Sequence, residues 1–212
     1  MPLCPVYFLY GFNLIFLRLW KIKDFDKPVS FEVFSDDFDE MEKQAIEIAK
    51  WGSNVIVKIP ITNTKGESSV ELVSKLSSKG LRINVTAMMT VEQVVSVLPA
   101  LSRGSCGYVS IFAGRIADAG VDPVPVMKEI LRLLKNYPGI ELIWASPREL
   151  FNIVQANQIG CHIITVTNDI LKKLPTIGKD LTEFSLETVK MFFNDASAAG
   201  YTIKHVPEKV LL

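Results

Sequence analysis

The chain has 212 residues, a length that suits one large domain better than two small ones. Its 23 Lys and Arg residues balance its 23 Asp and Glu residues, which argues against a protein that coats nucleic acid or an anionic membrane. A hydrophobic content of 49% excludes a disordered chain. The three cysteines, Cys4, Cys106 and Cys161, lack metal-ligand spacing, and there are only two histidines. We therefore expect a soluble, cytoplasmic protein that holds no metal.

Residues 1–20 form an apolar segment, and Lys21 and Lys23 follow it. Four residues interrupt the apolar run: Pro5, Gly11, Asn13 and Arg18. The uninterrupted stretches are shorter than the ~20 residues of a membrane span, and the start lacks the basic region of a signal peptide. We expect this segment to pack against the fold or in an oligomer interface, with a weak signal anchor as the alternative. We therefore divide the chain into an atypical N-terminal segment, 1–26, and one domain, 27–212.

After residue 27, short runs rich in β-branched residues alternate with stretches of helical periodicity. The predicted strands are Val29–Phe34, Asn54–Ile59, Arg82–Ala87, Tyr108–Phe112, Ile140–Ala145 and His162–Val166. They recur at intervals of roughly 22 to 31 residues, the length of a strand with its crossover helix. No glycine-rich phosphate loop follows a strand, which disfavours a nucleotide-binding open sheet. The pattern therefore predicts an α/β fold built as a β/α barrel.

The stretches between the strands carry ordinary helix signals. Three helices are predicted from apolar periodicity and glycine stops: Asp36 to Gly52, with Phe38, Met41, Ala45 and Ile48 on one face; Glu67 to Gly80; and Ser185 to Gly200. Two more are predicted to start at capping boxes, Thr90 with Gln93 and Ser146 with Glu149.

Polar side chains fall on one face of the predicted strands, because strand residues alternate between faces. Six of them lie toward the carboxyl ends of strands: Glu32, Lys58, Asn84, Thr86, Ser110 and Ser146. The outer face of a parallel barrel packs on helices, so the polar face points inward, to the end where barrel enzymes assemble their active sites. We predict that these residues converge on one site. Taken singly, Lys58 is also explained as a solvated surface lysine, and Glu32 as a structural ion-pair partner.

The predicted chemistry depends on Lys58, an amine that a barrel mouth would remove from water. Burial disfavours the charged form, so such an amine is a better nucleophile. It attacks a ketone or aldehyde and forms a Schiff base, whose nitrogen withdraws electrons from a neighbouring C–C bond. Aldol cleavage then needs neither a metal nor another cofactor. Glu32 and the Thr86 hydroxyl can carry out the proton transfers through a positioned water.

Five stretches, in this order, resemble the transaldolase family: NVIVKIPITNTKG, INVTAMMTVEQ, YVSIFAGRIADAGVDP, LIWASPRE and GCHIITVTNDIL. The similarity covers residues 27–203 and is strongest to the small branch that includes the fructose-6-phosphate aldolases. It implies a (β/α)8 TIM barrel. It also implies an enzyme of carbohydrate metabolism that forms a lysine Schiff base with a ketose phosphate and passes a dihydroxyacetone unit to an aldehyde, or releases it.

The resemblance also implies roles for single residues. Lys58 would be the Schiff-base lysine, and Glu32 and Thr86 would bind the catalytic water. Asn84 and Ser110 would form hydrogen bonds with the sugar hydroxyls or the imine region.

Three further residues would hold the sugar phosphate: Arg115, Ser146 and Arg148. Arginine suits this role because its guanidinium fork binds two phosphate oxygens at once. The alternative for Ser146 is a plain helix N-cap, and the alternative for each arginine is an exposed ion pair.

The sequence departs from the family near its start. Family members begin with a strand that carries an acid/base aspartate, and a second strand ends in Thr-Thr-Asn-Pro; neither is found here. We therefore expect an incomplete barrel or an altered N-terminus, with the gap filled by the apolar segment or by another copy in a homo-oligomer. A non-catalytic or truncated sugar-phosphate-binding relative is the alternative function, and a deoxyribose-phosphate-type aldolase fits the motifs less well.

Overall fold

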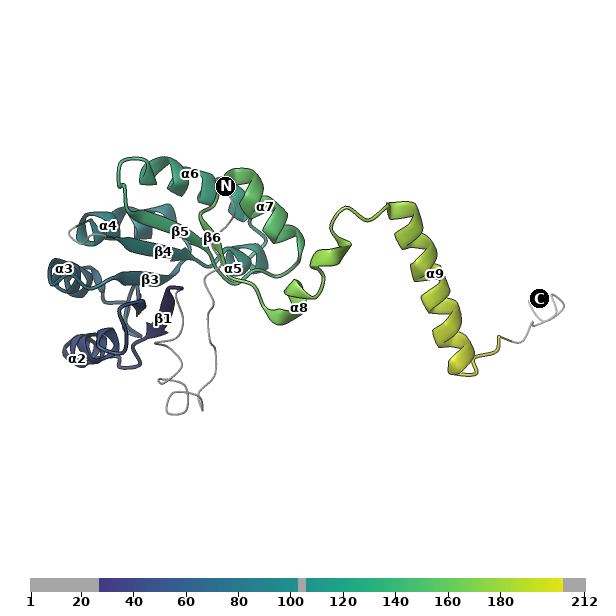
Figure 1. The fold of residues 1–212 in the computed structure, drawn as a ribbon, viewed down its shortest axis with the longest axis horizontal. Coiled ribbons are helices and arrows are strands. Elements are labelled where there is room, and N and C mark those ends of the chain that lie inside the picture. Colours follow the sequence, from purple (N-terminus) through teal and green to yellow (C-terminus); the bar gives the residue numbers. More distant parts are fainter. Residues whose placement is uncertain (1–26, 103–105, 204–212) are drawn as a thin grey trace, which may run out of the picture. The chain divides into compact units, whose positions relative to one another are not determined.

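The computed structural model describes residues 27–102 and 106–203, and the chain divides after Leu171 into two compact units (Figure 1). The larger unit holds one sheet of six parallel strands: β1 (Val29–Glu32), β2 (Val55–Pro60), β3 (Ile83–Met88), β4 (Gly107–Ile111), β5 (Ile140–Trp144) and β6 (Ile163–Ile164). The strands lie side by side in chain order, as in a barrel, whereas an open nucleotide-binding sheet reverses its order. The predicted α/β fold, an incomplete (β/α)8 barrel, is confirmed as a half-barrel. The predicted segment 1–26 lies outside the described residues.

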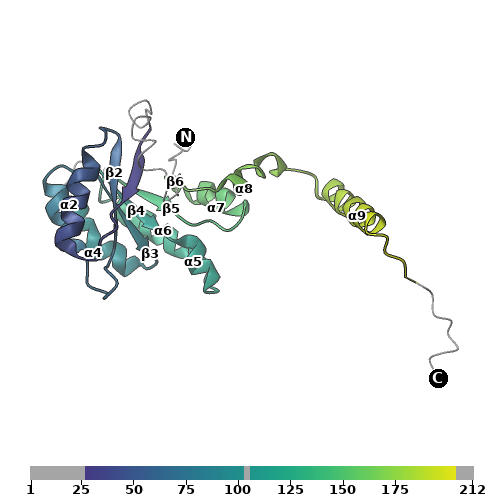
Figure 2. The ribbon, with the colours of Figure 1, turned by 90° about the horizontal axis from the view of Figure 1, so that it is seen from below.

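Helices follow the strands along the larger unit: α2 (Phe38–Ala49), α3 (Val70–Ser78), α4 (Val91–Leu101), α5 (Ala113–Asp118), α6 (Pro123–Leu134), α7 (Phe151–Ile159) and α8 (Asn168–Leu171). Helices α2, α3, α4 and α6 pack on the strands around one side of the sheet (Figures 1 and 2). Their buried residues, such as Met41 and Met127, form the main core with Val57, Val85 and Leu142 of the strands.

The two faces of the sheet differ as the alternation of strand residues predicts. Val57 and Val85 point to the helices in the main core, while Ile56 and Ile143 belong to a separate, smaller apolar cluster on the opposite, inner face. Lys58 lies two residues after Ile56 and therefore shares the inner face.

Two predicted helix starts are confirmed. The Asp37 carboxylate accepts a hydrogen bond from the Glu40 N–H at 3.0 Å and caps α2, one residue after the expected start. At α4, Thr90 and Gln93 form the predicted reciprocal capping box. Side-chain acceptors at these positions satisfy N–H groups that have no partner within the helix.

Two other predicted starts are wrong. Helix α3 begins at Val70, because the Asn63 side chain accepts from the Glu67 N–H at 3.0 Å and holds the preceding residues in a turn. Ser146 and Glu149 form no capping box, because Ser146 adopts a left-handed φ of 59° and α7 begins only at Phe151. The Asn152 side chain instead accepts from the backbone N–H groups of Arg148 and Glu149.

The smaller unit holds a short 3-10 turn, η1 (Leu174–Thr176), and the long helix α9 (Leu181–Ala198). The Asp180 carboxylate caps α9 by accepting from the N–H groups of Thr182 and Glu183, so the helix starts before the predicted Ser185. Among the residues that the structure describes, no helix is long and apolar enough to cross a membrane.

Candidate active site

Lys58 and Glu32 form the centre of the candidate site, at the carboxyl ends of β2 and β1. The strand register sets the two residues directly opposite each other. Lys58 is buried, and its Nζ donates a hydrogen bond to Glu32 Oε2 at 3.0 Å, while the Glu32 side chain is 39% exposed. The structure therefore brings a buried amine next to a carboxylate that reaches solvent.

A chain of hydrogen bonds continues the site across the inner face. The Asn84 Nδ2 donates to Ser30 Oγ at 3.2 Å, and the Ser110 hydroxyl donates to Asn84 Oδ1 at 2.7 Å. All three side chains are buried, and Asn84 is in register with Lys58. Because β2 lies between β1 and β3, the bond from Asn84 to Ser30 indicates a concave inner face.

Thr86 lies beyond Asn84 on the same face of β3 and is 1% exposed. Its hydroxyl oxygen has no hydrogen-bond partner among the described residues. A buried hydroxyl without a partner is unfavourable, so Thr86 offers its hydroxyl to a water or ligand held here. The next residue, Ala87, has a φ of 61°, and the pairing of β3 with β4 is irregular between Val85 and Met88. Backbone in this region is uncommon for alanine and recurs at functional sites.

The residues predicted to bind phosphate lie around α5 and the segment after β5. The Arg148 Nη1 donates to Ser146 Oγ at 3.2 Å, so these two side chains are in contact. The Nε of Arg148 also donates to both carboxylate oxygens of Asp118, at 2.9 and 3.1 Å, and its Nη2 donates to Asp118 as well. Arg115 is exposed on α5.

The electrostatics of this group centre on Asp118. Hydrogen bonds from Arg148 hold the pKa of the Asp118 carboxyl below its usual value, and the positive charges of Arg148 and Arg115 lower it further. Asp118 is therefore a carboxylate at neutral pH, and both arginines act on it.

Three residues of the site were not predicted. Ser30 shares the polar face with Glu32, and this alternation was the available signal. Asp118 stands within the GRIAD stretch of a family motif but was given no role. Gly114 lies in the same stretch: a Cβ atom there would come within 1.6 Å of the Ser146 carbonyl oxygen, so only glycine lets α5 approach this closely.

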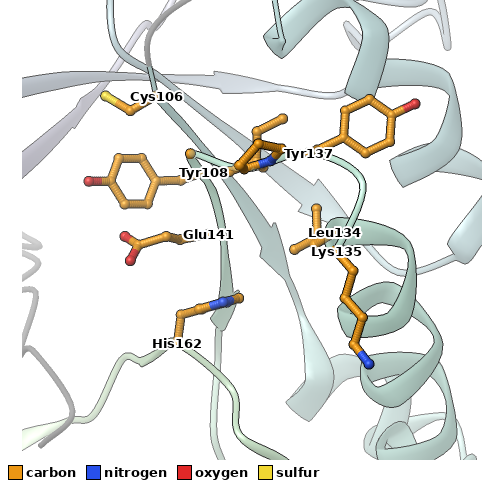
Figure 3. Close-up of a pocket in the computed structure, with 10 residues that line it drawn as sticks. Cys106, Tyr108, Leu134, Lys135, Tyr137, Glu141 and His162 are labelled. Atoms are coloured by element: carbon orange, nitrogen blue, oxygen red, sulfur yellow. The ribbon is translucent and has the colours of Figure 1, made fainter. Parts of the chain in front are cut away.

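A pocket of about 550 Å³ lies at the opposite, amino-terminal ends of β4, β5 and β6. Figure 3 shows Tyr108 and Glu141 extending to one side of it, while Tyr137 and Lys135 point away from them. The described residues that line the pocket include none of the predicted site residues, so it is separate from the Lys58 group. The described residues also contain no group of three His, Cys, Asp or Glu side chains that could hold a metal ion.

Comparisons with known proteins agree with the resemblance seen in the sequence. The sequence profile of the Transaldolase/Fructose-6-phosphate aldolase family matches residues 13–212. A "Probable transaldolase" of Thermoanaerobacter sp. is 34% identical over 166 residues, which cover 78% of this chain and 72% of that protein. The chain belongs to the transaldolase/fructose-6-phosphate aldolase family. A "Probable transaldolase" of Dehalococcoides mccartyi is 41% identical over 148 residues, which cover 69% of this chain and 64% of the length of that protein.

A third member of the family, a "Probable transaldolase" of Nitrosopumilus maritimus, is 31% identical over 83% of this chain and 76% of its own length. Among solved structures, a mandelate oxidase mutant with a monooxide FMN adduct has a TM-score of 0.50 and 16% identity, covering 66% of this chain and 48% of that one. This last likeness concerns the fold alone. The transaldolase/fructose-6-phosphate aldolase family thus accounts for the sequence and for the barrel-type sheet.

Proposed function

We propose that the chain is a transaldolase-type enzyme in which Lys58 forms a Schiff base with a ketose phosphate. The observation that carries this proposal is the buried Lys58 amine, 3.0 Å from the Glu32 carboxylate, at the carboxyl edge of a barrel-type sheet. Family membership supports the reaction class, and the geometry supplies a nucleophile and a proton acceptor in contact.

In the proposed reaction the Lys58 amine adds to the substrate ketone, and loss of water leaves a protonated imine. Glu32 accepts the proton that the amine loses, and a water at the Thr86 hydroxyl relays protons to the departing oxygen. The imine withdraws electrons from the bond between its α and β carbons, while the β-hydroxyl gives its proton through the water at Thr86 to Glu32, which is a carboxylate again after the dehydration. This step releases an aldehyde phosphate and leaves an enamine on Lys58. Addition of the enamine to a second aldehyde forms a new imine, and its hydrolysis releases the product ketose and restores the Lys58 amine. Protonation of the enamine followed by hydrolysis releases dihydroxyacetone instead.

We propose that the substrate is held at two places. The buried Asn84 and Ser110 offer an amide and a hydroxyl to the sugar hydroxyls or the imine region. Arg115, Ser146 and Arg148 bind the phosphate group, because guanidinium groups pair with phosphate oxygens through charge-assisted hydrogen bonds. A reducing, cytoplasmic compartment is consistent with Cys106 and Cys161, both free thiols.

The function is tested by incubating the full chain with fructose 6-phosphate, with and without a second aldehyde as acceptor. We expect glyceraldehyde 3-phosphate to form. Product that depends on the acceptor identifies a transferase, and product in its absence identifies an aldolase. A chain that binds inorganic phosphate but forms no product under either condition would instead be the non-catalytic sugar-phosphate-binding relative.

We also propose that the chain forms homo-oligomers, and helix α9 supports this. Within the smaller unit, none of its residues is buried. Its large exposed apolar side chains are Leu181, Phe184, Leu186, Val189, Met191, Phe192 and Phe193. Apolar surface of this extent is typical of an interaction site.

The oligomer is tested by light scattering after size exclusion. We expect a multiple of the 23.7 kDa chain mass, and a shift toward one chain in Phe193→Glu. Lys190→Glu places the same carboxylate at an exposed polar position of α9 and should leave the mass unchanged. A wild-type protein that elutes as a single chain at micromolar concentration would exclude the proposal.

A further inference from the structure

Resting on the proposed function, we propose that Asp118 is the positioning residue that orients Arg148 toward the phosphate of the substrate. Asp118 lies at the last position of α5, and Arg148 lies beyond β5 in the next β/α unit. Their carboxylate–guanidinium contact is bidentate, the geometry that fixes the plane of a guanidinium most firmly.

Some N–H groups of the Arg148 guanidinium bond to neighbouring side chains, and the others remain for a ligand. Of its five N–H groups, the Nε–H and one Nη2–H face Asp118, and one Nη1–H faces the Ser146 hydroxyl. The two N–H groups that take part in none of these bonds lie one on each Nη atom. Both remain able to donate to phosphate oxygens.

The backbone around this contact is also fixed. The Arg148 N–H donates to Asn152 Oδ1 at 2.8 Å. Gly114 lets α5 lie against the Ser146 carbonyl, where a Cβ atom would come within 1.6 Å. The start and the end of α5 are thus both attached to the segment that carries Ser146 and Arg148.

A purely structural role explains Asp118 poorly. The two side chains are 44% and 52% exposed, and ion pairs this exposed add little to the stability of a fold. A long arginine side chain that is already ordered, however, loses less freedom when a ligand binds it. The positive charge of Arg115 also acts on the same carboxylate.

The direction in which Asp118→Asn changes phosphate affinity distinguishes a positioning role from a purely electrostatic one. Removing a carboxylate near a phosphate removes a repulsion, so electrostatics alone predicts that Asp118→Asn binds phosphate more tightly. Positioning predicts the opposite, because Arg148 must then be ordered by the ligand itself. We expect the Kd for inorganic phosphate to rise about fivefold.

The control is another exposed arginine–carboxylate ion pair, which lies outside the candidate site. On α6, Arg132 makes a bidentate contact with Glu129, through bonds of 2.9 and 2.7 Å, and both side chains are exposed. Glu129→Gln makes the same acid-to-amide change and should leave phosphate affinity at the wild-type value. Thermal unfolding of both variants should match the wild type within a few degrees.

The experiment is calorimetric titration of the full chain with inorganic phosphate, for the wild type and the two variants, followed by kinetics with fructose 6-phosphate and with unphosphorylated fructose. Weaker phosphate binding in Asp118→Asn alone, with a higher KM for the phosphorylated sugar only, supports the proposal. Equal or tighter binding in Asp118→Asn, an equal effect of Glu129→Gln, or no phosphate binding by the wild type overturns it. Phosphate titration does not depend on Lys58. If the proposed Schiff-base reaction fails, no product forms from fructose 6-phosphate, and this result is distinct from a failure of the Asp118 proposal, which the titration detects.

Discussion

Replacing Lys58 with alanine is expected to lower turnover of fructose 6-phosphate by roughly a thousand-fold or more, since the variant has no amine to form the imine. The fold should survive, because Glu32, the partner left behind, is partly exposed and can be solvated. Turnover is measured as release of glyceraldehyde 3-phosphate, and circular dichroism verifies the fold.

Two further variants make the Lys58 result specific. Lys58→Arg keeps a positive charge opposite Glu32 but has no nucleophilic amine, so it should be as inactive as the alanine variant. Lys65→Ala removes an exposed lysine from the loop that follows the same strand and should leave turnover unchanged. Normal turnover in Lys58→Ala would refute the assignment of the lysine.

Gly114→Ala is expected to destabilise the protein by about 3 kcal/mol, the upper end of the range for overpacking a close contact. The added methyl group would lie 1.6 Å from the Ser146 carbonyl oxygen, a backbone atom that no side-chain rotation can move away. Alanine is favoured over glycine within a helix by up to about 1 kcal/mol, which is too little to offset the clash. Chemical denaturation measures the change, and phosphate affinity should fall with it.

The matched control for Gly114 is Gly120, just past the end of the same helix. Gly120 has a φ of +78°, and no atom lies within 4 Å of a Cβ placed there. Gly120→Ala should therefore cost only the ~1–2 kcal/mol of a left-handed alanine, with phosphate affinity unchanged. Equal losses of stability in the two variants would mean that the contact with Ser146 is not tight.

The strand half of the candidate site could be predicted from the sequence. Strand side chains alternate strictly, so the polar residues of β1 to β4 had to share a face, and parallel register brought Glu32 to Lys58 and Asn84 to Ser110. Ser30 was on the correct face, but its bond to Asn84 depends on the curvature of the sheet across β2. Curvature of that kind arises from how the strands of the sheet pair and pack together, and the sequence of one strand does not reveal it.

The arrangement around Arg148, the group proposed to bind phosphate, could not be predicted from the sequence. Ser146 fits a capping box by sequence, but the approach of α5 through Gly114 and the acceptor on Asn152 give that segment another conformation. The bond from Arg148 to Asp118 joins residues thirty positions apart. Such contacts are set by how two β/α units pack, and local spacing does not encode them.

The most direct measurement is borohydride reduction of the full chain in the presence of fructose 6-phosphate, followed by peptide mapping by mass spectrometry. Reduction turns a lysine imine into a stable secondary amine and so marks the lysine that reacted. We expect a sugar-derived adduct on the peptide that contains Lys58, absent without the sugar and absent in Lys58→Arg. An adduct on a different lysine, or cleavage of the sugar with no trapped adduct, would contradict it.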